Sequence, residues 1–197
     1  MSLTRINISS LVIDSLCEQA GKKDLAVAWL YCDFLAHQEQ SATAMLGAIL
    51  RQLVSVREMP KDIRQRFRKP FSDRGLQIPN IVDMLKKAIS RLPLVYICID
   101  ALDESDAKEC RPELLESLRD IFQESPNMRV LFTGRPHAED EVRKFFSGVI
   151  TIPVSPTERD IRVYLGMRLD RDTEPKAMDH DLRRDIMRII PKMISGV

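Results

Sequence analysis

Three mostly apolar stretches of the chain predict buried strands. Each runs through large apolar side chains and ends in a polar residue: residues 25–33 (LAVAWLYCD), 94–100 (LVYICID) and 128–133 (MRVLFT). Apolar runs without polar alternation are typical of strands that are covered on both faces, as in a parallel sheet. Because the C-terminal ends of parallel strands meet at one edge, we expect Asp33, Asp100 and Thr133 at the same edge of one sheet.

Apolar residues at helical spacing predict helices between these strands. The clearest stripe follows Ser41, a favourable N-cap residue, and consists of Met45, Leu46, Ile49, Leu50, Leu53 and Val54. Asn80 is a candidate N-cap of the next helix, Pro112 lies in the first turn of another, and Thr157 with Asp160 resembles a capping box. Strands that alternate with helices of about ten or more residues indicate βαβ crossovers. The predicted fold class is therefore α/β, with a mostly parallel sheet and flanking helices.

Three further elements are predicted from the same pattern. Residues 149–154 (VITIPV) form a strand, and a last helix from about Asp179 is interrupted by Pro191. A helix over residues 8–19 carries its apolar residues at helical spacing: Ile8, Leu11, Val12 and Leu16.

Composition and charge narrow the classes of function. The 197 residues are 44% hydrophobic, enough to bury a substantial core, and 30 basic against 29 acidic residues give a net charge of +1. This balance argues against a surface built for nucleic acid, and we interpret the basic stretch at residues 60–79 as a solvated helix face without assigned function. The longest apolar run, residues 25–32, is far shorter than the roughly 18 residues that span a bilayer. We therefore expect no nucleic-acid partner and no membrane span.

The cysteines and the N-terminus predict an intracellular protein. The four cysteines show neither a CxxC pair nor regular spacing, and Cys32 and Cys98 lie inside apolar strand runs. Reduced core thiols are therefore favoured over disulfides or a zinc site. The N-terminus carries no apolar segment like that of a signal peptide. Together these features predict an intracellular, cytoplasmic location.

Motifs at the strand ends resemble a known family of signalling ATPases. IDALDE, residues 99–104, is similar to the Walker B motif of NACHT-type (STAND) P-loop NTPases, and FTGRPH, residues 132–137, resembles their sensor strand. AWLYCDFLAHQEQS, residues 28–41, resembles the second strand and following helix of the nephrocystin-like NACHT modules common in fungal proteins. In such proteins ankyrin or other repeats usually follow. The resemblance covers the chain from about residue 8 to its C-terminus.

The resemblance implies roles for five residues. Asp100 would hold Mg²⁺ through water, and Asp103 or Glu104 would orient the attacking water. Thr133 and Arg135 would lie beside the terminal phosphate. Intact relatives use Mg²⁺ with ATP or GTP. From the residues alone, the acidic strand end reads equally well as a solvated turn.

The N-terminal residues depart from the family pattern. In the family, a glycine-rich loop ending in Gly-Lys-Ser or Gly-Lys-Thr precedes the first helix and wraps the phosphates with backbone N–H groups. Here MSLTRIN holds neither glycine nor lysine; Arg5 stands about where the lysine would be, and Ile6 about where the hydroxyl would be. Ile6 cannot ligate a metal, and the wide fork of Arg5 fits a tight anion nest poorly. We therefore expect a P-loop NTPase-like core truncated at its Walker A end, lacking the first strand and phosphate-binding loop, so that residues 149–154 have no neighbouring strand.

The predicted function is that of a fragment of a nucleotide-binding NACHT signalling and oligomerisation module. Residues 1–155 would be the partial NTPase core, and residues 156–197 the start of the C-terminal helical part. As written, the chain is expected to bind no cofactor and to hydrolyse neither ATP nor GTP. Two alternatives stay open, so enzymatic activity is not decided by the sequence. The first is a non-catalytic fragment that associates with protein partners or with itself, and the second is an active NTPase with an atypical phosphate loop.

Overall fold

The computed structural model describes residues 3–20, 24–36, 40–55, 77–106, 108–171 and 179–194. The basic stretch that begins at residue 60 lies outside these residues up to residue 76, and its interpretation as a helix face stays a prediction. The chain consists of two compact units, Met1–Val149 and Ile150–Val197, and each is described by itself.

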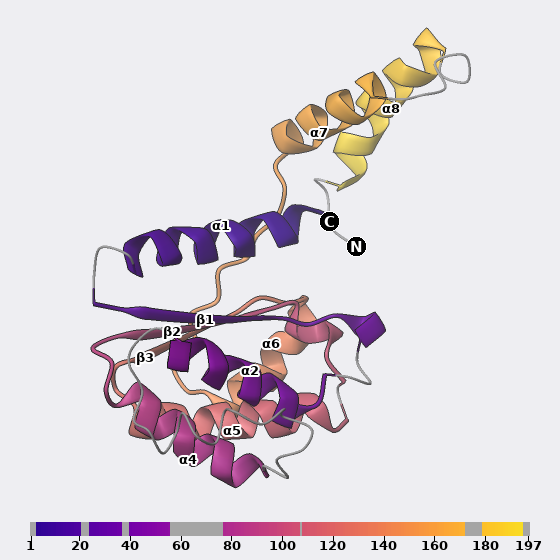
Figure 1. Cartoon of the computed structure of the whole chain (residues 1–197). Coiled ribbons are helices and arrows are strands. Elements are labelled where there is room, and N and C mark those ends of the chain that lie inside the picture. The colour runs from indigo at the N-terminus through magenta and orange to yellow at the C-terminus, as the bar shows by residue number, and fades with distance from the viewer. Residues whose placement is uncertain are drawn as a thin grey trace. The chain divides into compact units, whose positions relative to one another are not determined.

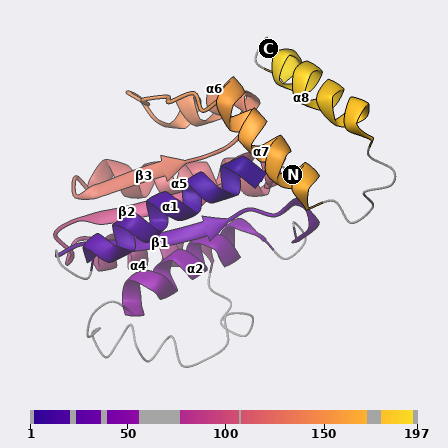
Figure 2. The ribbon, with the colours of Figure 1, turned by 90° about the horizontal axis from the view of Figure 1, so that it is seen from above.

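Three parallel strands form the sheet of the first unit. β1 (Ala26–Tyr31), β2 (Val95–Asp100) and β3 (Met128–Phe132) lie side by side in that order (Figure 2). In the parallel register Tyr31 is opposite Asp100, so the strands end together at one edge. The predicted parallel sheet and the α/β fold class are confirmed.

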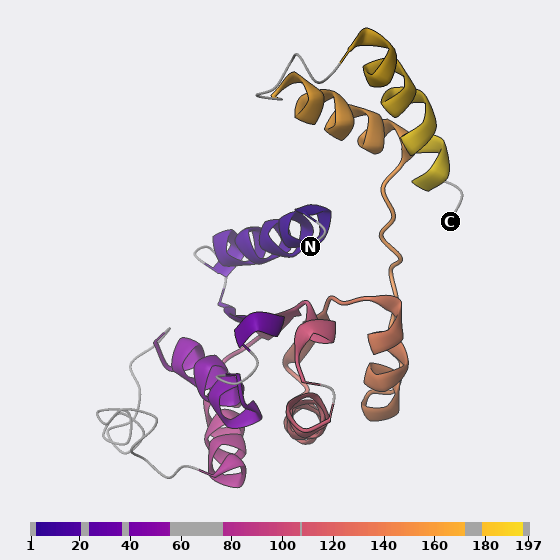
Figure 3. The same cartoon turned by 90° about the vertical axis from the view of Figure 1, so that its right-hand side faces the viewer.

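Helices cover both faces of this sheet (Figure 1, Figure 3). On one face α1 (Leu3–Ala20) packs over β1 and β2. On the other face lie three helices: α2 (Ala42–Ser55), α4 (Ile78–Ile89) and α5 (Cys110–Glu124). α6 (Pro136–Phe145) packs against α5. The main core lies between the sheet and α2, α4 and α5, where fully buried side chains include Leu46, Leu50, Leu85, Ile97 and Leu114. Cover on both faces explains why β2 is apolar along its length.

Two of the predicted helix starts can be checked against backbone hydrogen bonds. Ser41 caps α2 as predicted, because its Oγ accepts from the backbone N–H of Ala44 at 3.2 Å. The prediction that Asn80 caps the next helix is wrong: α4 begins at Ile78, and Pro79 lies in its first turn. Proline is well tolerated there, because the first N–H groups of a helix have no partner within the helix.

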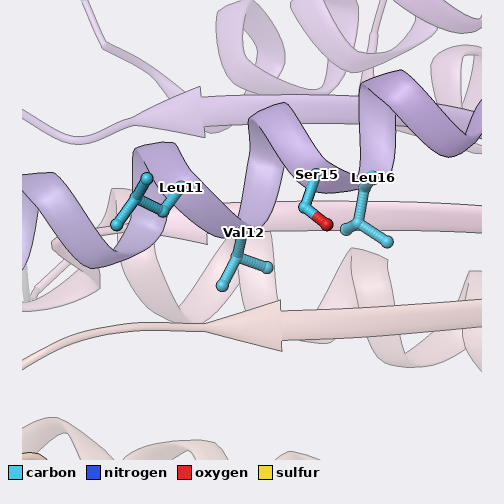
Figure 4. A pocket seen from close by; sticks show the side chains of 4 residues that line it. All are labelled: Leu11, Val12, Ser15 and Leu16. Atoms are coloured by element: carbon cyan, nitrogen blue, oxygen red, sulfur yellow. The ribbon is translucent and has the colours of Figure 1, made fainter.

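The apolar residues that predicted the first helix do not all lie on the buried side of α1. Leu11 is 67% exposed and Val12 is 36% exposed, whereas Ser9 and Ile13, four residues apart, are buried against the sheet. Leu11, Val12, Ser15 and Leu16 instead line a shallow hollow along another side of the helix (Figure 4). The helix is turned so that Ser9 reaches polar groups at the sheet edge, and spacing of apolar residues alone does not reveal that requirement.

The expected strand at residues 149–154 does not form. Val149 packs against the core of the first unit, but Ile150 and Ile152 are 87% and 78% exposed. A strand needs a neighbour for its N–H and C=O groups, and Pro153 has no N–H to offer. Within the described residues no neighbouring strand is present for this segment.

The second unit is a helical hairpin. α7 (Glu158–Asp170) begins with the predicted capping box, in which Thr157 and Asp160 each accept the other's backbone N–H. The prediction that Pro191 interrupts the last helix is wrong, since α8 (His180–Ile194) continues past it. Proline at this position leaves the carbonyl of Met187 without its usual donor, and Nη1 of Arg162 donates to that carbonyl at 3.0 Å. The hairpin thus compensates for the lost helical bond.

Among the described helices, none has both the length and the apolar character that crossing a bilayer requires.

The outer edge of β3 has no strand partner among the described residues. The N–H of Thr133 donates to the carbonyl of Ile99 on β2. Successive residues of a strand direct their backbone groups to opposite sides, so the N–H and C=O groups of Val130 and Phe132 point away from β2. The side chain of Leu131 lies on the same face of the sheet as α1, but α1 packs over β1 and β2, and Leu131 is 36% exposed. An unpaired, apolar strand edge promotes pairing with other chains.

We therefore expect the chain to self-associate with rising concentration, and Leu131→Lys to suppress this association. A lysine at the edge adds charge to the surface that a second strand must approach. Light scattering after size-exclusion chromatography measures the mass, with Val163→Lys on exposed α7 as the matched control. Equal association of Leu131→Lys and the unmodified chain would contradict this expectation.

Candidate functional site

Asp100 ends β2 at the edge where the strand ends meet, and it is buried there. Its Oδ1 accepts hydrogen bonds from the hydroxyls of Ser9, on α1, and Thr133, just after β3. The two hydroxyls also lie 3.4 Å apart. One buried carboxylate therefore links α1, β2 and the end of β3. The two hydroxyls donate hydrogen bonds to Oδ1, which offsets the free-energy cost of removing the carboxylate from water.

The chain turns sharply after Asp100. Ala101 has a φ of 53° and a ψ of 45°, the left-handed region that non-glycine residues rarely adopt. Its N–H donates to Oγ1 of Thr133 at 3.1 Å, and the N–H of Leu102 donates to the Thr133 carbonyl at 2.9 Å. Thr133 thus bonds both the acidic residue and the turn that follows it, and the 3-10 helix η3 (Leu102–Glu104) begins in a fixed place.

Asp103, on η3, is bound to Arg135 at the N-terminus of α6. Its Oδ1 accepts the backbone N–H of Arg135 at 3.0 Å, and its Oδ2 lies 3.2 Å from Nε of the same residue. The Asp103 side chain is 6% exposed, whereas the Arg135 side chain is 61% exposed. Gly134 permits this approach, because a Cβ there would lie 3.3 Å from Oδ1 of Asp103.

Arg111, in the first turn of α5, fixes the backbone of the same acidic turn. Its Nη2 donates to the carbonyls of Asp103 and Ser105, its Nε to Oγ of Ser105, and its Nη1 to Glu141 of α6 at 3.0 Å. The arginine side chain is 5% exposed, so these bonds replace the water it has lost. Sequence reasoning missed Arg111, because a charged residue in a first helical turn is usually solvated and nothing in its neighbours marks it as buried.

Ser9 was also missed as a site residue. A signal does exist in the sequence, since Ser9 stands four residues before Ile13 and therefore on the same face of the helix. The apolar neighbours Leu11 and Val12 favoured a different face.

Glu104 differs from the two other acids of the motif. Among the residues that the structure describes, no side-chain or backbone donor bonds its carboxylate, and it is half-buried. Asp100 is buried, the side chain of Asp103 is 6% exposed, and both carboxylates accept hydrogen bonds. Glu104 is thus the acid of this group whose carboxylate is available to a ligand.

The other predicted rim residue, Asp33, bonds within its own turn. Its Oδ1 accepts the N–H of Leu35 at 2.9 Å in the 3-10 helix η1 (Phe34–Ala36), and Oε1 of Gln40 accepts its N–H at 3.1 Å. At the N-terminus, the backbone of Arg5 and Ile6 is helical, within α1.

The oxygen groups around Asp100 can be compared with what a metal needs. No cluster of three or more His, Cys, Asp or Glu side chains that could enclose a metal occurs in the described part of the chain. Mg²⁺ nonetheless binds commonly through one or two carboxylates, water and the phosphates of a ligand. A carboxylate with hydroxyls from Ser9 and Thr133 fits that donor set, so Asp100 could hold Mg²⁺ that arrives with a phosphate ligand.

Comparison with known proteins gives a family match and a distant likeness to solved structures. The family model described as nephrocystin 3, N-terminal, matches residues 7–135, well over half of the chain. No curated protein matches the sequence. The Walker-type ATPase PABY2304 of Pyrococcus abyssi is similar with a TM-score of 0.43 and 13% sequence identity, over 92% of this chain. This chain spans 62% of that ATPase, and a likeness so distant carries no argument about function. The family match confirms the predicted resemblance to a nephrocystin-like module.

Proposed function

Since this chain belongs to the nephrocystin 3, N-terminal family, we propose that it is part of a nucleotide-controlled signalling and oligomerisation module of NACHT (STAND) type. The strongest support is the meeting of Asp100 and Thr133 at the ends of adjacent parallel strands. That edge is where open α/β sheets bind ligands, because the loops diverge there. In this proposal, relatives carry ankyrin or other repeats after the module.

Each residue at the edge has a proposed role toward a nucleoside triphosphate. Asp100 holds Mg²⁺ through water, and Thr133 orients the carboxylate of Asp100 by its hydrogen bond. Bound Mg²⁺ would neutralise charge on the phosphates. Glu104 orients the attacking water; we favour it over Asp103 because Asp103 is already bound to Arg135. Arg135, with its exposed side chain, contacts the terminal phosphate.

The chain itself has few groups to hold the phosphates. Carboxylates beside a triphosphate repel it unless Mg²⁺, backbone N–H groups and cations compensate. Residues 1–7 contain no glycine and no lysine that could form the phosphate-binding nest of a P-loop. We propose that the 197-residue chain by itself does not hold ATP or GTP firmly and does not hydrolyse it.

We expect the chain to bind MgATP with a Kd no tighter than about 1 mM, equivalent to roughly 4 kcal/mol, and to show no hydrolysis above background. Isothermal titration calorimetry with MgATP measures the affinity, and Asp100→Asn separates metal-dependent binding from nonspecific binding. Micromolar binding that is lost in Asp100→Asn would contradict this expectation and favour an active NTPase with an atypical phosphate loop.

A non-catalytic interaction fragment is the second candidate. The open edge of β3 and the exposed apolar side of α1 favour it, since both are surfaces that a partner chain could cover. Light scattering with and without MgATP distinguishes this candidate from the first. For an interaction fragment, we expect the association of the chain to be the same in both conditions.

A further inference from the structure

We propose that Asp103 acts as an internal competitor for Arg135, so that a linear oligophosphate binds the Arg135 guanidinium in competition with the Asp103 carboxylate. The inference rests on the proposed function, in which Arg135 contacts a terminal phosphate. It assigns Asp103 a regulatory role in place of a catalytic one.

The geometry of the pair supports competition. Nε of Arg135 lies 3.2 Å from Oδ2 of Asp103, within the range in which a guanidinium and a carboxylate interact directly. The backbone N–H of Arg135 is bonded to the other oxygen, Oδ1. Asp103 therefore directs both of its oxygens at the one residue that is expected to meet the phosphate.

Asp103 cannot easily move away from this position. Nη2 of Arg111 donates to the backbone carbonyl of Asp103 at 2.9 Å, and Glu141, on α6, forms an ion pair with Arg111. The carboxylate is 6% exposed and is closely approached by Gly134. Arg135, by contrast, is 61% exposed and lies on the solvent side of the pair, so its guanidinium is the partner that can swing toward a ligand.

A carboxylate in this place has two effects on an incoming anion. It pairs with the Nε side of the guanidinium, and it repels the negative charge of the phosphate groups. Both effects weaken the binding of an oligophosphate to Arg135 as long as the pair is formed. The guanidinium side of the pair is 61% exposed, so water screens its attraction to the carboxylate and a polyanion can compete for it.

Asp103→Asn is the sharpest variant for a test. Asparagine keeps an oxygen that can accept the N–H of Arg135, and its backbone carbonyl remains available to Arg111. What it removes is the negative charge. We expect the affinity for tripolyphosphate to rise by about two- to five-fold, the range that the loss of one weak ion pair allows.

The experiment follows the thermal unfolding of the dilute chain by the fluorescence of Trp29 as tripolyphosphate is added, with a chelator present. Metal is excluded so that the outcome does not depend on Mg²⁺ at Asp100, which the titration with MgATP addresses separately. Arg135→Gln should abolish the gain in Tm, and in Asp103→Asn combined with Arg135→Gln the gain should stay absent. Asp83→Asn, which removes the partner of Lys87 on α4, is the charge-matched control and should behave like the unmodified chain.

Tighter binding in Asp103→Asn that depends on Arg135 supports the proposal, and a destabilised site would not produce it. Equal or weaker binding in Asp103→Asn, or no tripolyphosphate binding in either form, overturns it. If Asp103→Asn does not fold, NMR of the unmodified chain gives the answer. A saturable shift of the Arg135 Nε–Hε resonance on addition of tripolyphosphate supports displacement of Asp103, and an unchanged resonance at concentrations that raise Tm overturns it.

Discussion

Replacement of Arg111 by methionine should lower the free energy of unfolding by about 3 kcal/mol, the lower end of the cost of breaking a buried ion pair. The variant leaves the carbonyls of Asp103 and Ser105 and the carboxylate of Glu141 without their donor. Glu141 is 21% exposed, so water can compensate part of its loss, which places the effect at the lower end. Urea unfolding followed by Trp29 fluorescence measures the change.

A matched substitution separates burial from charge. Arg119, on the same helix, is 32% exposed and pairs with Asp120 and Glu116. Arg119→Met should cost far less than Arg111→Met, because exposed ion pairs contribute little. Similar losses in both variants would show that Arg111 does not hold the acidic turn in the way its hydrogen bonds suggest.

Alkylation of Cys32 in the folded chain should be about a thousand-fold slower at about pH 8 than in the unfolded chain. Burial raises the pKa of the Cys32 thiol to about 12, with further contributions from Cys110 and Asp100. Burial likewise raises the pKa of Cys98 to about 11. An unfolded cysteine has a pKa of about 8.5, and only the thiolate reacts, so each unit of difference is a tenfold change in rate. Iodoacetamide labelling with and without urea, read by mass spectrometry of peptides, measures the ratio, with half-exposed Cys17 as the faster internal standard.

The same pKa shifts predict how stability depends on pH. The folded pKa of each thiol is raised, so the neutral form is favoured in the folded state. The corresponding stability is present below the unfolded pKa and is lost as pH rises from about 8.5 toward the folded values. The free energy of unfolding should therefore fall between about pH 9 and pH 11. Cys32→Ala with Cys98→Ala should flatten this fall, and an unchanged slope would mean that other groups cause it.

The structure divides the acids of the IDALDE motif into three kinds. Asp100 is buried and bonded by hydroxyls, Asp103 is bonded to Arg135, and Glu104 has no partner among the described residues. The sequence could not make this division, because three carboxylates within five residues look alike until the turn that carries them is known. That turn depends on Ala101 in the left-handed conformation.

The sequence by itself determined the class of the fold and the place of the site. Residues 94–99 are apolar without alternation, as in a strand covered on both faces, and the alternation of such runs with helical patterns indicates a parallel sheet with flanking helices. Polar residues at the ends of parallel strands must share an edge, which brings Asp100 and Thr133 together without any knowledge of tertiary contacts.

Tertiary structure decided which polar groups pair at that edge and which apolar segments are buried. The rotation of α1 is fixed by the hydroxyl of Ser9 on Asp100, a contact between residues 91 positions apart, and local spacing therefore favoured the wrong face. Residues 149–154 have the composition of a strand but, in the part of the chain that the structure describes, no neighbour to complete a ladder. The helix continues through Pro191 because Arg162, on another helix, bonds the carbonyl that proline leaves free. Each outcome depends on a partner far away in the chain, and a local pattern carries no information about such a partner.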